Sequence, residues 1–125
     1  MICAILTTNF VFHFQSKPKV TLLYESLCPG CHQFILTQLH PAYTKLQDHI
    51  DIELVPFGNA HERTSNGREY FQCQHGQNEC YGNFAQACAI DMLKSQKASL
   101  EFVYCMTSYS LSESTEKTSR EVKIP

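Results

Sequence analysis

The alternation of apolar and polar positions divides the first half of the chain into a strand, a helix and a second strand. Residues 19–26 (KVTLLYES) are apolar and β-branched, which is typical of a buried strand. Residues 31–49 place apolar side chains at helical spacings, and Pro41 should kink this helix or end its first half. Residues 50–58 (IDIELVPFG) predict a second strand. A strand–helix–strand unit of this kind implies two parallel strands joined by a right-handed crossover.

The second half of the chain predicts a polar connection followed by two helices. Residues 59–78 are mostly polar and contain turn-forming residues such as Asn66 and Gly67. Helical periodicity then returns in two segments, residues 79–96 and 98–110. In the first of these, Phe84 and Met92 belong to a face that the periodicity predicts to be apolar and shared with Cys80 and Cys88.

The two ends of the chain differ from the part between them. Residues 1–16 are apolar and lack acidic residues, which indicates a secretory signal, with an added strand or a disordered leader as the alternatives. This segment is too short for a membrane span, which needs about 20 apolar residues. Residues 111–125 are rich in Ser, Thr and charge and should stay disordered. We therefore expect a single domain over residues 17–110.

Composition narrows the class of protein. The chain has 125 residues and a formal net charge of −2, which argues against nucleic acid or an anionic membrane as a partner. Seven cysteines are many for this length. If a signal segment is removed, Cys3 leaves with it and six cysteines remain. An even number is typical of an exported protein with disulfides.

Cys28 and Cys31 form a CxxC motif between the first strand and the helix. Pro29 suits the first helical turn, so Cys28 should lie at the positive end of the helix, where a thiolate is favoured. Cys31 is one turn further and can resolve a mixed disulfide by attacking Cys28. A protonated His32 would favour the thiolate further. The motif therefore predicts a redox dithiol, with a structural disulfide or two idle thiols as alternatives.

Two other chemistries use the same spacing. A zinc site needs four ligands, commonly in two close pairs, and the sequence has no second CxxC or closely spaced histidine pair. The letters CPGCH also match a haem-attachment motif, but a strongly β-forming segment precedes them. Both chemistries are less favoured than the redox dithiol, and we expect no metal and no cofactor.

A second cysteine motif, CQHGQNECYGNFAQAC, covers residues 73–88. Cys80 and Cys88 lie two helical turns apart, and a rise of about 12 Å prevents a bond between them along a straight helix. With Cys73 and Cys105 they allow three pairings. We favour Cys73 with Cys80 or a neighbour, and Cys88 with Cys105. His75 is expected to be a hydrogen-bonded structural residue, the alternatives being a ligand or a base.

This second motif resembles the signature of the gamma-interferon-inducible lysosomal thiol reductase (GILT) family, C-Q-H-G-x2-E-C-x2-N-x4-C. The sequence matches it at eight positions: Cys73, Gln74, His75, Gly76, Glu79, Cys80, Asn83 and Cys88. The segments LLYESLCPGC and VPFGNA also resemble that family. The resemblance covers residues from about 19 to about 107.

The resemblance implies a thioredoxin-like fold with a helical, disulfide-bearing insertion. It implies reduction of protein disulfides by Cys28 and Cys31, with a small-molecule thiol as reductant and with the signature cysteines serving structure. It also implies a secreted protein or one of the endosomes and lysosomes.

The sequence departs from that family after about residue 110. The family continues with a proline-containing loop, two strands and a helix, whereas the only proline here after Pro56 is Pro125. We therefore expect an α/β, partial thioredoxin-like fold with its C-terminal strands missing. Tyr24, Leu54 and Phe57 would then lack part of their packing. We expect marginal stability and impaired activity, and a non-catalytic binding module is the alternative function.

Overall fold

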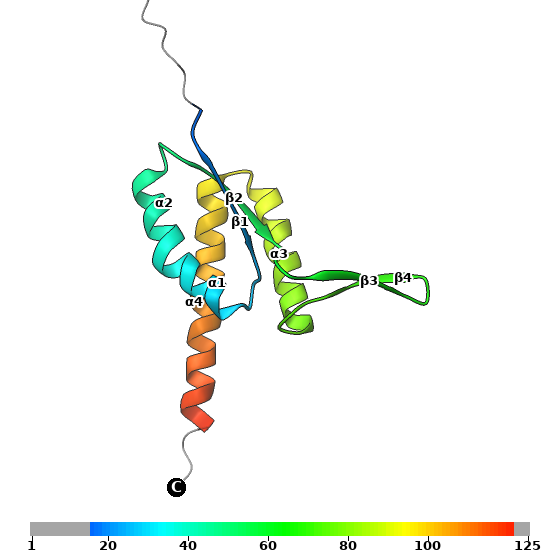
Figure 1. The fold of residues 1–125 in the computed structure, drawn as a ribbon. Coiled ribbons are helices and arrows are strands. Elements are labelled where there is room, and N and C mark those ends of the chain that lie inside the picture. Colours follow the sequence, from blue (N-terminus) through cyan, green and yellow to red (C-terminus); the bar gives the residue numbers. More distant parts are fainter. Residues whose placement is uncertain (1–15, 122–125) are drawn as a thin grey trace, which may run out of the picture.

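A computed structural model describes residues 16–121, with side chains through residue 110 (Figure 1). The predicted signal segment therefore lies outside the described residues except for Ser16, as do residues 122–125 of the predicted tail. The described elements are β1 (Lys19–Tyr24), α1 (Pro29–Phe34), the π-helix η1 (Ile35–Leu39), α2 (His40–Leu46), β2 (Asp51–Pro56), β3 (His61–Ser65), β4 (Arg68–Gln72), α3 (Gln77–Leu93) and α4 (Gln96–Glu121).

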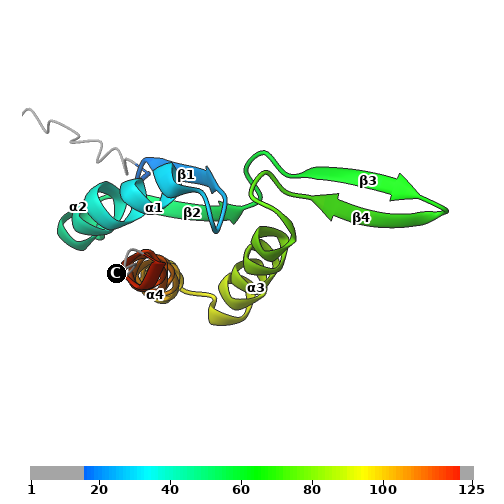
Figure 2. The same cartoon turned by 90° about the horizontal axis from the view of Figure 1, so that it is seen from below.

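A parallel pair of strands, β1 and β2, forms the centre of the fold, as the sequence predicted. Their register runs from Lys19 opposite Asp51 to Tyr24 opposite Pro56. The helical segment α1–η1–α2 connects the two strands, and α3 and α4 both pack against β2. The views in Figures 1 and 2 show α4 lying between α2 and α3. The chain is thus a mixed α/β structure.

The hydrophobic core lies between the strand pair and the helices. Its buried residues come from β1, η1, α2, β2 and α4, and are Tyr24, Ile35, Leu39, Tyr43, Ile52, Leu54, Leu100 and Val103. Tyr24 and Leu54 are therefore buried despite the small sheet, in one core cluster with Leu100 and Val103 of α4. Phe57, in contrast, is 41% exposed, as expected from its position after the end of β2.

Pro41 neither ends nor breaks the helix that joins the strands. The turn before it widens into η1, in which the N–H of His40 bonds the carbonyl of Ile35 five residues earlier. A proline lacks the N–H that an α-helical turn would use, and the wider turn takes up this irregularity.

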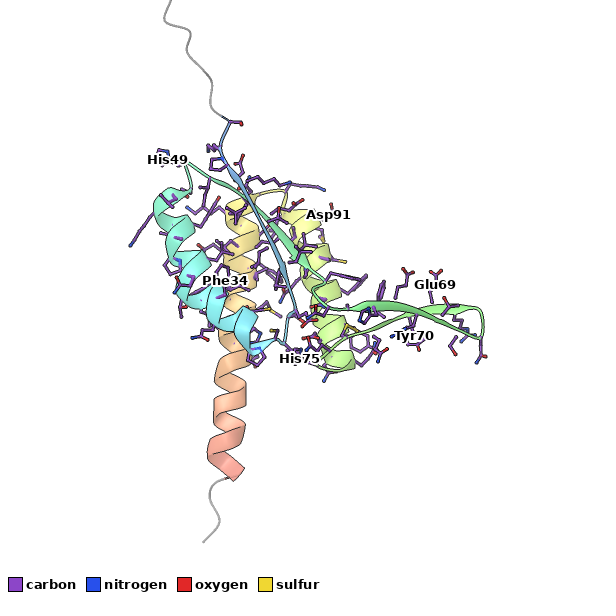
Figure 3. The ribbon with its side chains drawn as sticks, in the orientation of Figure 1. Phe34, His49, Glu69, Tyr70, His75 and Asp91 are labelled. Carbon is purple, nitrogen blue, oxygen red and sulfur yellow. A yellow bond between two sulfur atoms is a disulfide. The ribbon has the colours of Figure 1, made fainter. Side chains whose placement is uncertain are left out.

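The polar connection after β2 is a β-hairpin, which the sequence did not predict. β3 and β4 pair antiparallel, and Asn66 and Gly67 form the two-residue turn between Ser65 and Arg68. Both turn residues have positive φ angles, of 50° and 72°, as a type I′ turn requires. Figure 3 shows Glu69 and Tyr70 on this hairpin, away from the helices.

The two predicted C-terminal helices are present as α3 and α4. However, α4 continues to Glu121 and therefore includes residues 111–121, which we expected to be disordered. A regular helix makes its own backbone hydrogen bonds, so a Ser- and Thr-rich composition does not exclude it. None of the described helices combines the length and apolarity that a membrane span requires.

Candidate active site

The CxxC motif lies at the junction of β1 and α1. Cys28 is the N-cap of α1, Pro29 occupies the first helical turn, and the backbone N–H of Cys31 donates to the Cys28 sulfur at 3.5 Å. The backbone N–H of His32 also bonds the Cys28 carbonyl at 3.0 Å. Both cysteines are free thiols of intermediate exposure. This geometry turns one of the free N–H groups of the helix start, that of Cys31, towards the Cys28 sulfur.

The Cys31 thiol has different surroundings. Burial raises the pKa of Cys31 from 9.0 to about 11; the backbone N–H of Glu25, which bonds the sulfur, opposes this shift, and the neighbouring Cys28 and the Glu25 charge add to it. Cys31 therefore stays protonated at neutral pH unless another group accepts its proton.

His32 holds the loop that precedes the cysteines. Its ring is buried, and Nε2 donates to the backbone carbonyl of Ser26 at 2.7 Å. A carbonyl only accepts, so Nε2 carries the hydrogen. The ring also lines a mostly apolar pocket of about 470 Å³ beside the motif, together with Leu27, Pro29 and Leu36.

Helix α3 docks on the same loop through buried polar groups. The backbone N–H of Ser26 donates to Asn83 Oδ1 at 2.8 Å, and its hydroxyl donates to the Glu79 carbonyl at 3.0 Å. One residue before the loop, the Tyr24 hydroxyl donates to Gln86 Oε1 at 2.6 Å. These contacts join the two cysteine motifs into one site.

Gly82 permits this close approach of α3. A Cβ atom at residue 82 would lie 2.4 Å from the Ser26 hydroxyl oxygen, which is shorter than any ordinary contact. Sequence reasoning singled out neither Ser26 nor Gly82, although both lie inside the segments that carry the two motifs. Only the tertiary packing reveals the contact between them.

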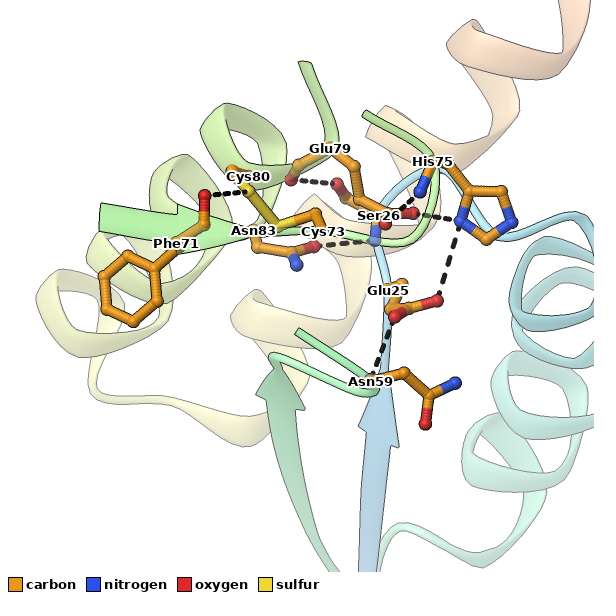
Figure 4. Close-up of a disulfide and its surroundings, with 9 residues drawn as sticks. All are labelled: Glu25, Ser26, Asn59, Phe71, Cys73, His75, Glu79, Cys80 and Asn83. Atoms are coloured by element: carbon orange, nitrogen blue, oxygen red, sulfur yellow. Dashed lines mark hydrogen bonds and ion pairs between the residues drawn. A yellow bond between two sulfur atoms is a disulfide. The ribbon is translucent and has the colours of Figure 1, made fainter. Parts of the chain in front are cut away.

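Glu25, His75 and Glu79 form a second group of interacting side chains, which connects the residue after β1 with the start of α3 (Figure 4). His75 donates its backbone N–H to Glu79 Oε1 at 3.0 Å and its Nδ1 hydrogen to Oε2 at 2.7 Å. The same Nδ1 lies 3.6 Å from Glu25 Oε2. Both carboxylates are buried, whereas the His75 side chain is 32% exposed. His75 is thus hydrogen-bonded, as the sequence predicted.

The loop after β2 contributes the remaining contact of Glu25. The backbone N–H of Asn59 donates to Glu25 Oε1 at 2.9 Å, and the Asn59 side chain donates to Gln74 Oε1 at 3.0 Å. Gly58 has a φ of +53°, and a Cβ there would lie 2.4 Å from the Glu25 Cγ atom. A glycine is therefore required beside Glu25 for both conformational and steric reasons.

Ligand atoms of the three side chains Glu25, His75 and Glu79 lie within 4.8 Å of one another, and among the described residues no other such group is close enough to hold a metal ion. Their oxygens already accept protein hydrogens. The CxxC sulfurs do not belong to this group.

Cys73 and Cys80 are joined by a disulfide with a Cα–Cα distance of 5.6 Å. It ties the segment after β4 to the first turn of α3, whose N-cap is Gly76 with a φ of 90°. Cys88 and Cys105 are free and exposed, so the bond expected between them is wrong. Their side chains lie on the solvent-exposed sides of α3 and α4.

The fold and this site define a small α/β protein with a CxxC dithiol at a strand-to-helix junction and a disulfide-tied helix docked on it. Comparison with known proteins identifies the family. The profile of the family described as "Gamma interferon inducible lysosomal thiol reductase (GILT)" matches residues 19–123, and the chain belongs to this family.

Curated relatives agree with this assignment. The chain is 42% identical over 106 residues to the gamma-interferon-inducible lysosomal thiol reductase of Carassius auratus, covering 85% of the chain and 41% of the relative. It is 43% identical over 88 residues to the mouse protein of the same name (Mus musculus), covering 70% of the chain and 35% of that protein. The gamma-interferon-responsive lysosomal thiol protein of Arabidopsis thaliana is 41% identical over 103 residues, with 82% and 43% covered. The chain thus spans about two fifths of the length of these relatives.

Proposed function

We propose that this chain is a thiol–disulfide oxidoreductase that reduces protein disulfides, with Cys28 as nucleophile and Cys31 as resolving thiol. The observation that carries the proposal is the position of Cys28 at the N-cap of α1, where the Cys31 N–H points at its sulfur. Backbone N–H groups at a helix start stabilise negative charge on an attacking sulfur. The relatives' names, which include thiol reductases, support the same chemistry.

The reaction would proceed in two exchanges. The Cys28 thiolate attacks a substrate disulfide, which forms a mixed disulfide and releases one substrate sulfur as a thiolate. Cys31 then attacks Cys28, which releases the second substrate sulfur and leaves a Cys28–Cys31 disulfide. The substrate gains two electrons and the protein dithiol loses two. A small-molecule thiol would restore the dithiol.

We also propose a thioredoxin-like architecture and a cellular compartment for this chain. The parallel β1–β2 pair, its helical crossover and the CxxC at the helix start support a thioredoxin-like unit into which the hairpin and α3 are inserted. The Cys73–Cys80 disulfide is typical of an oxidising compartment, and the relatives' names refer to the lysosome. We therefore place the chain in the secretory pathway, either extracellular or in endosomes and lysosomes.

Thiol alkylation tests the proposed nucleophile. In the chain with its CxxC reduced, we expect iodoacetamide at mildly acidic pH to modify Cys28 at least about tenfold faster than Cys105, a free exposed thiol in the middle of α4. Mass spectrometry of the peptides gives both rates. Cys28→Ser should abolish reduction of a protein disulfide, whereas Cys105→Ser should not change it. Equal alkylation rates would overturn the assignment of Cys28.

A further inference from the structure

The loop that carries Cys28 belongs to no helix or strand. Residues 25–28 lie between the end of β1 and the start of α1, so their position depends on tertiary contacts. Cys28 is tied to this loop and to α1, because its N–H donates to the Glu25 carbonyl at 3.3 Å and its carbonyl accepts the His32 N–H at 3.0 Å. The position of the Cys28 sulfur at the helix start therefore depends on the contacts that fix the loop.

Ser26 is the residue through which α3 fixes this loop. Its side chain is buried, its N–H donates to Asn83 Oδ1 at 2.8 Å, and its hydroxyl donates to the Glu79 carbonyl at 3.0 Å (Figure 4). Both partners belong to α3. The Ser26 carbonyl accepts the Nε2 hydrogen of His32, on α1, at 2.7 Å. Ser26 thus connects α3 with the helix that Cys28 caps.

Asn83 makes its contact to the loop at an energetic cost. Its side chain is 6% exposed, and its Nδ2 atom is buried without a hydrogen-bond partner in the described part of the chain. Burying an N–H group without a partner is unfavourable. An apolar side chain would avoid this cost, so the amide at this position is explained by its oxygen, which accepts the Ser26 N–H.

The backbone of α3 also approaches Ser26 closely at Gly82. A Cβ atom at residue 82 would lie 2.4 Å from the Ser26 hydroxyl oxygen and 3.0 Å from the Ser26 Cβ atom. Rotation of the hydroxyl group would relieve only the first of these contacts and would break its bond to Glu79. A side chain at residue 82 must therefore displace the loop or the helix.

We propose that α3 sets the reactivity of the CxxC nucleophile, with Ser26, Gly82 and Asn83 as positioning residues. This inference rests on the proposed dithiol function and gives the second cysteine motif a part in it. A backbone N–H stabilises a thiolate only while it points at the sulfur, and the Cys31 N–H reaches the Cys28 sulfur at 3.5 Å. A loop that shifts away from α3 turns the sulfur away from this N–H and lowers the fraction of reactive thiolate.

Gly82→Ala gives the first test, because it adds one methyl group between α3 and the loop. With the CxxC reduced, iodoacetamide at pH 6 should modify Cys28 about tenfold more slowly than in the wild type, with Cys105 of α4 as the reference thiol in the same molecule. At pH 10, where an ordinary thiol is largely ionised without help, the difference should shrink to within about twofold. Tandem mass spectrometry gives both rates. Alanine normally favours a helix over glycine, so a weaker α3 would not explain a slower reaction.

Ser26→Gly combined with Gly82→Ala is the rescue variant, since it removes the atoms that the new methyl group would meet. Ser26→Gly alone keeps the N–H that donates to Asn83 and should slow Cys28 by no more than about threefold at pH 6. The double variant should react like Ser26→Gly alone, and therefore faster than Gly82→Ala. If the two substitutions instead slow Cys28 additively, the contact between α3 and the loop does not control its reactivity, and the proposal is overturned.

Asn83→Leu gives an independent test, which also decides the matter if Gly82→Ala fails to fold. Leucine keeps the branched shape of asparagine but accepts no hydrogen bond, so Cys28 should again react about tenfold more slowly at pH 6. Met92→Ala is the matched control, because Met92 lies on the same helix and is 81% exposed, and its rates should equal those of the wild type. Equal rates of Cys28 and Cys105 in the wild type would refute the dithiol function itself. A fast Cys28 that stays equally fast in Gly82→Ala and Asn83→Leu would refute only the positioning role of α3.

Discussion

At the scale of single residues, the two thiols of one short motif have different roles because their neighbours differ. Cys28 caps α1 and receives a backbone hydrogen bond, whereas Cys31 lies one turn into the helix against the buried end of β1. The difference comes from position rather than from residue type. It is consistent with an attacking thiol that must be charged and a resolving thiol that must stay neutral until it is used.

The raised pKa of Cys31 predicts a loss of stability at alkaline pH. The folded chain keeps the Cys31 proton up to a pH of about 11, whereas an unfolded thiol loses it near 9. The unfolded state therefore binds fewer protons in this window, and the free energy of unfolding should fall as the pH rises from about 9 to about 11. Below pH 9 the thiol should make no contribution to the pH dependence.

Denaturant unfolding of the chain with its CxxC reduced, at pH 8 and pH 10, measures this effect. Cys31→Ser removes the group that titrates, so its unfolding midpoint should fall less between the two pH values than that of the wild type. Equal falls in the two proteins would contradict the assigned pKa.

At the scale of elements, the disulfide joins the hairpin to α3 and so helps to hold α3 against the CxxC loop. The Cys73–Cys80 bond closes a loop over a sequence separation of 7 residues. For loops of this size, cross-linking contributes about 2 to 3 kcal/mol in the chain-entropy account. We expect the double variant Cys73→Ser/Cys80→Ser to lose about this much stability in denaturant unfolding.

The free cysteines provide the control for this prediction. Cys88→Ser and Cys105→Ser remove exposed thiols, and each should change the free energy of unfolding by less than about 0.5 kcal/mol. A comparable loss in these variants, or no loss in the double variant, would show that the disulfide does not stabilise the chain.

Some of these elements could be predicted from the sequence, and others could not. Apolar periodicity predicted β1, the crossover helix and β2, because these elements bury apolar side chains in the core. The hairpin had no such pattern, since both of its strands are exposed on both faces. Its Asn66-Gly67 turn was the only local evidence for it.

Helix α3 shows why the candidate site was only partly predictable. The sequence indicated an apolar face that included Phe84 and Met92, yet these side chains are 71% and 81% exposed. The helix instead buries Glu79, Asn83 and Gln86. Gln86 and Asn83 are buried against partners far away in the sequence, Tyr24 of β1 and Ser26 of the CxxC loop, whereas Glu79 pairs with His75 just before the helix. Pairing of this kind leaves no periodic apolar pattern in the sequence.

At the scale of the whole molecule, the small sheet leaves one face open. Within the described residues, β1 and β2 pair only with each other, so both are edge strands. The open face contains a polar cluster in which Lys19 pairs with Glu53 at 3.0 Å and Thr21 donates to Glu53. Next to this cluster Leu23 is 64% exposed. The marginal stability that the sequence indicated remains a prediction.

This open face predicts self-association of the purified chain, because edge strands with exposed apolar side chains are templates for further pairing. Leu23→Lys places a charge on the edge and should lower the association measured by sedimentation over a range of protein concentrations. The free energy of unfolding should change by less than about 0.5 kcal/mol, since the side chain is exposed. Leu46→Lys replaces a leucine that is 44% exposed but belongs to α2 rather than to the sheet, and should leave association unchanged. If both variants associate like the wild type, the strand edge is not the contact surface, and if both associate less, general hydrophobicity rather than the open sheet drives the process.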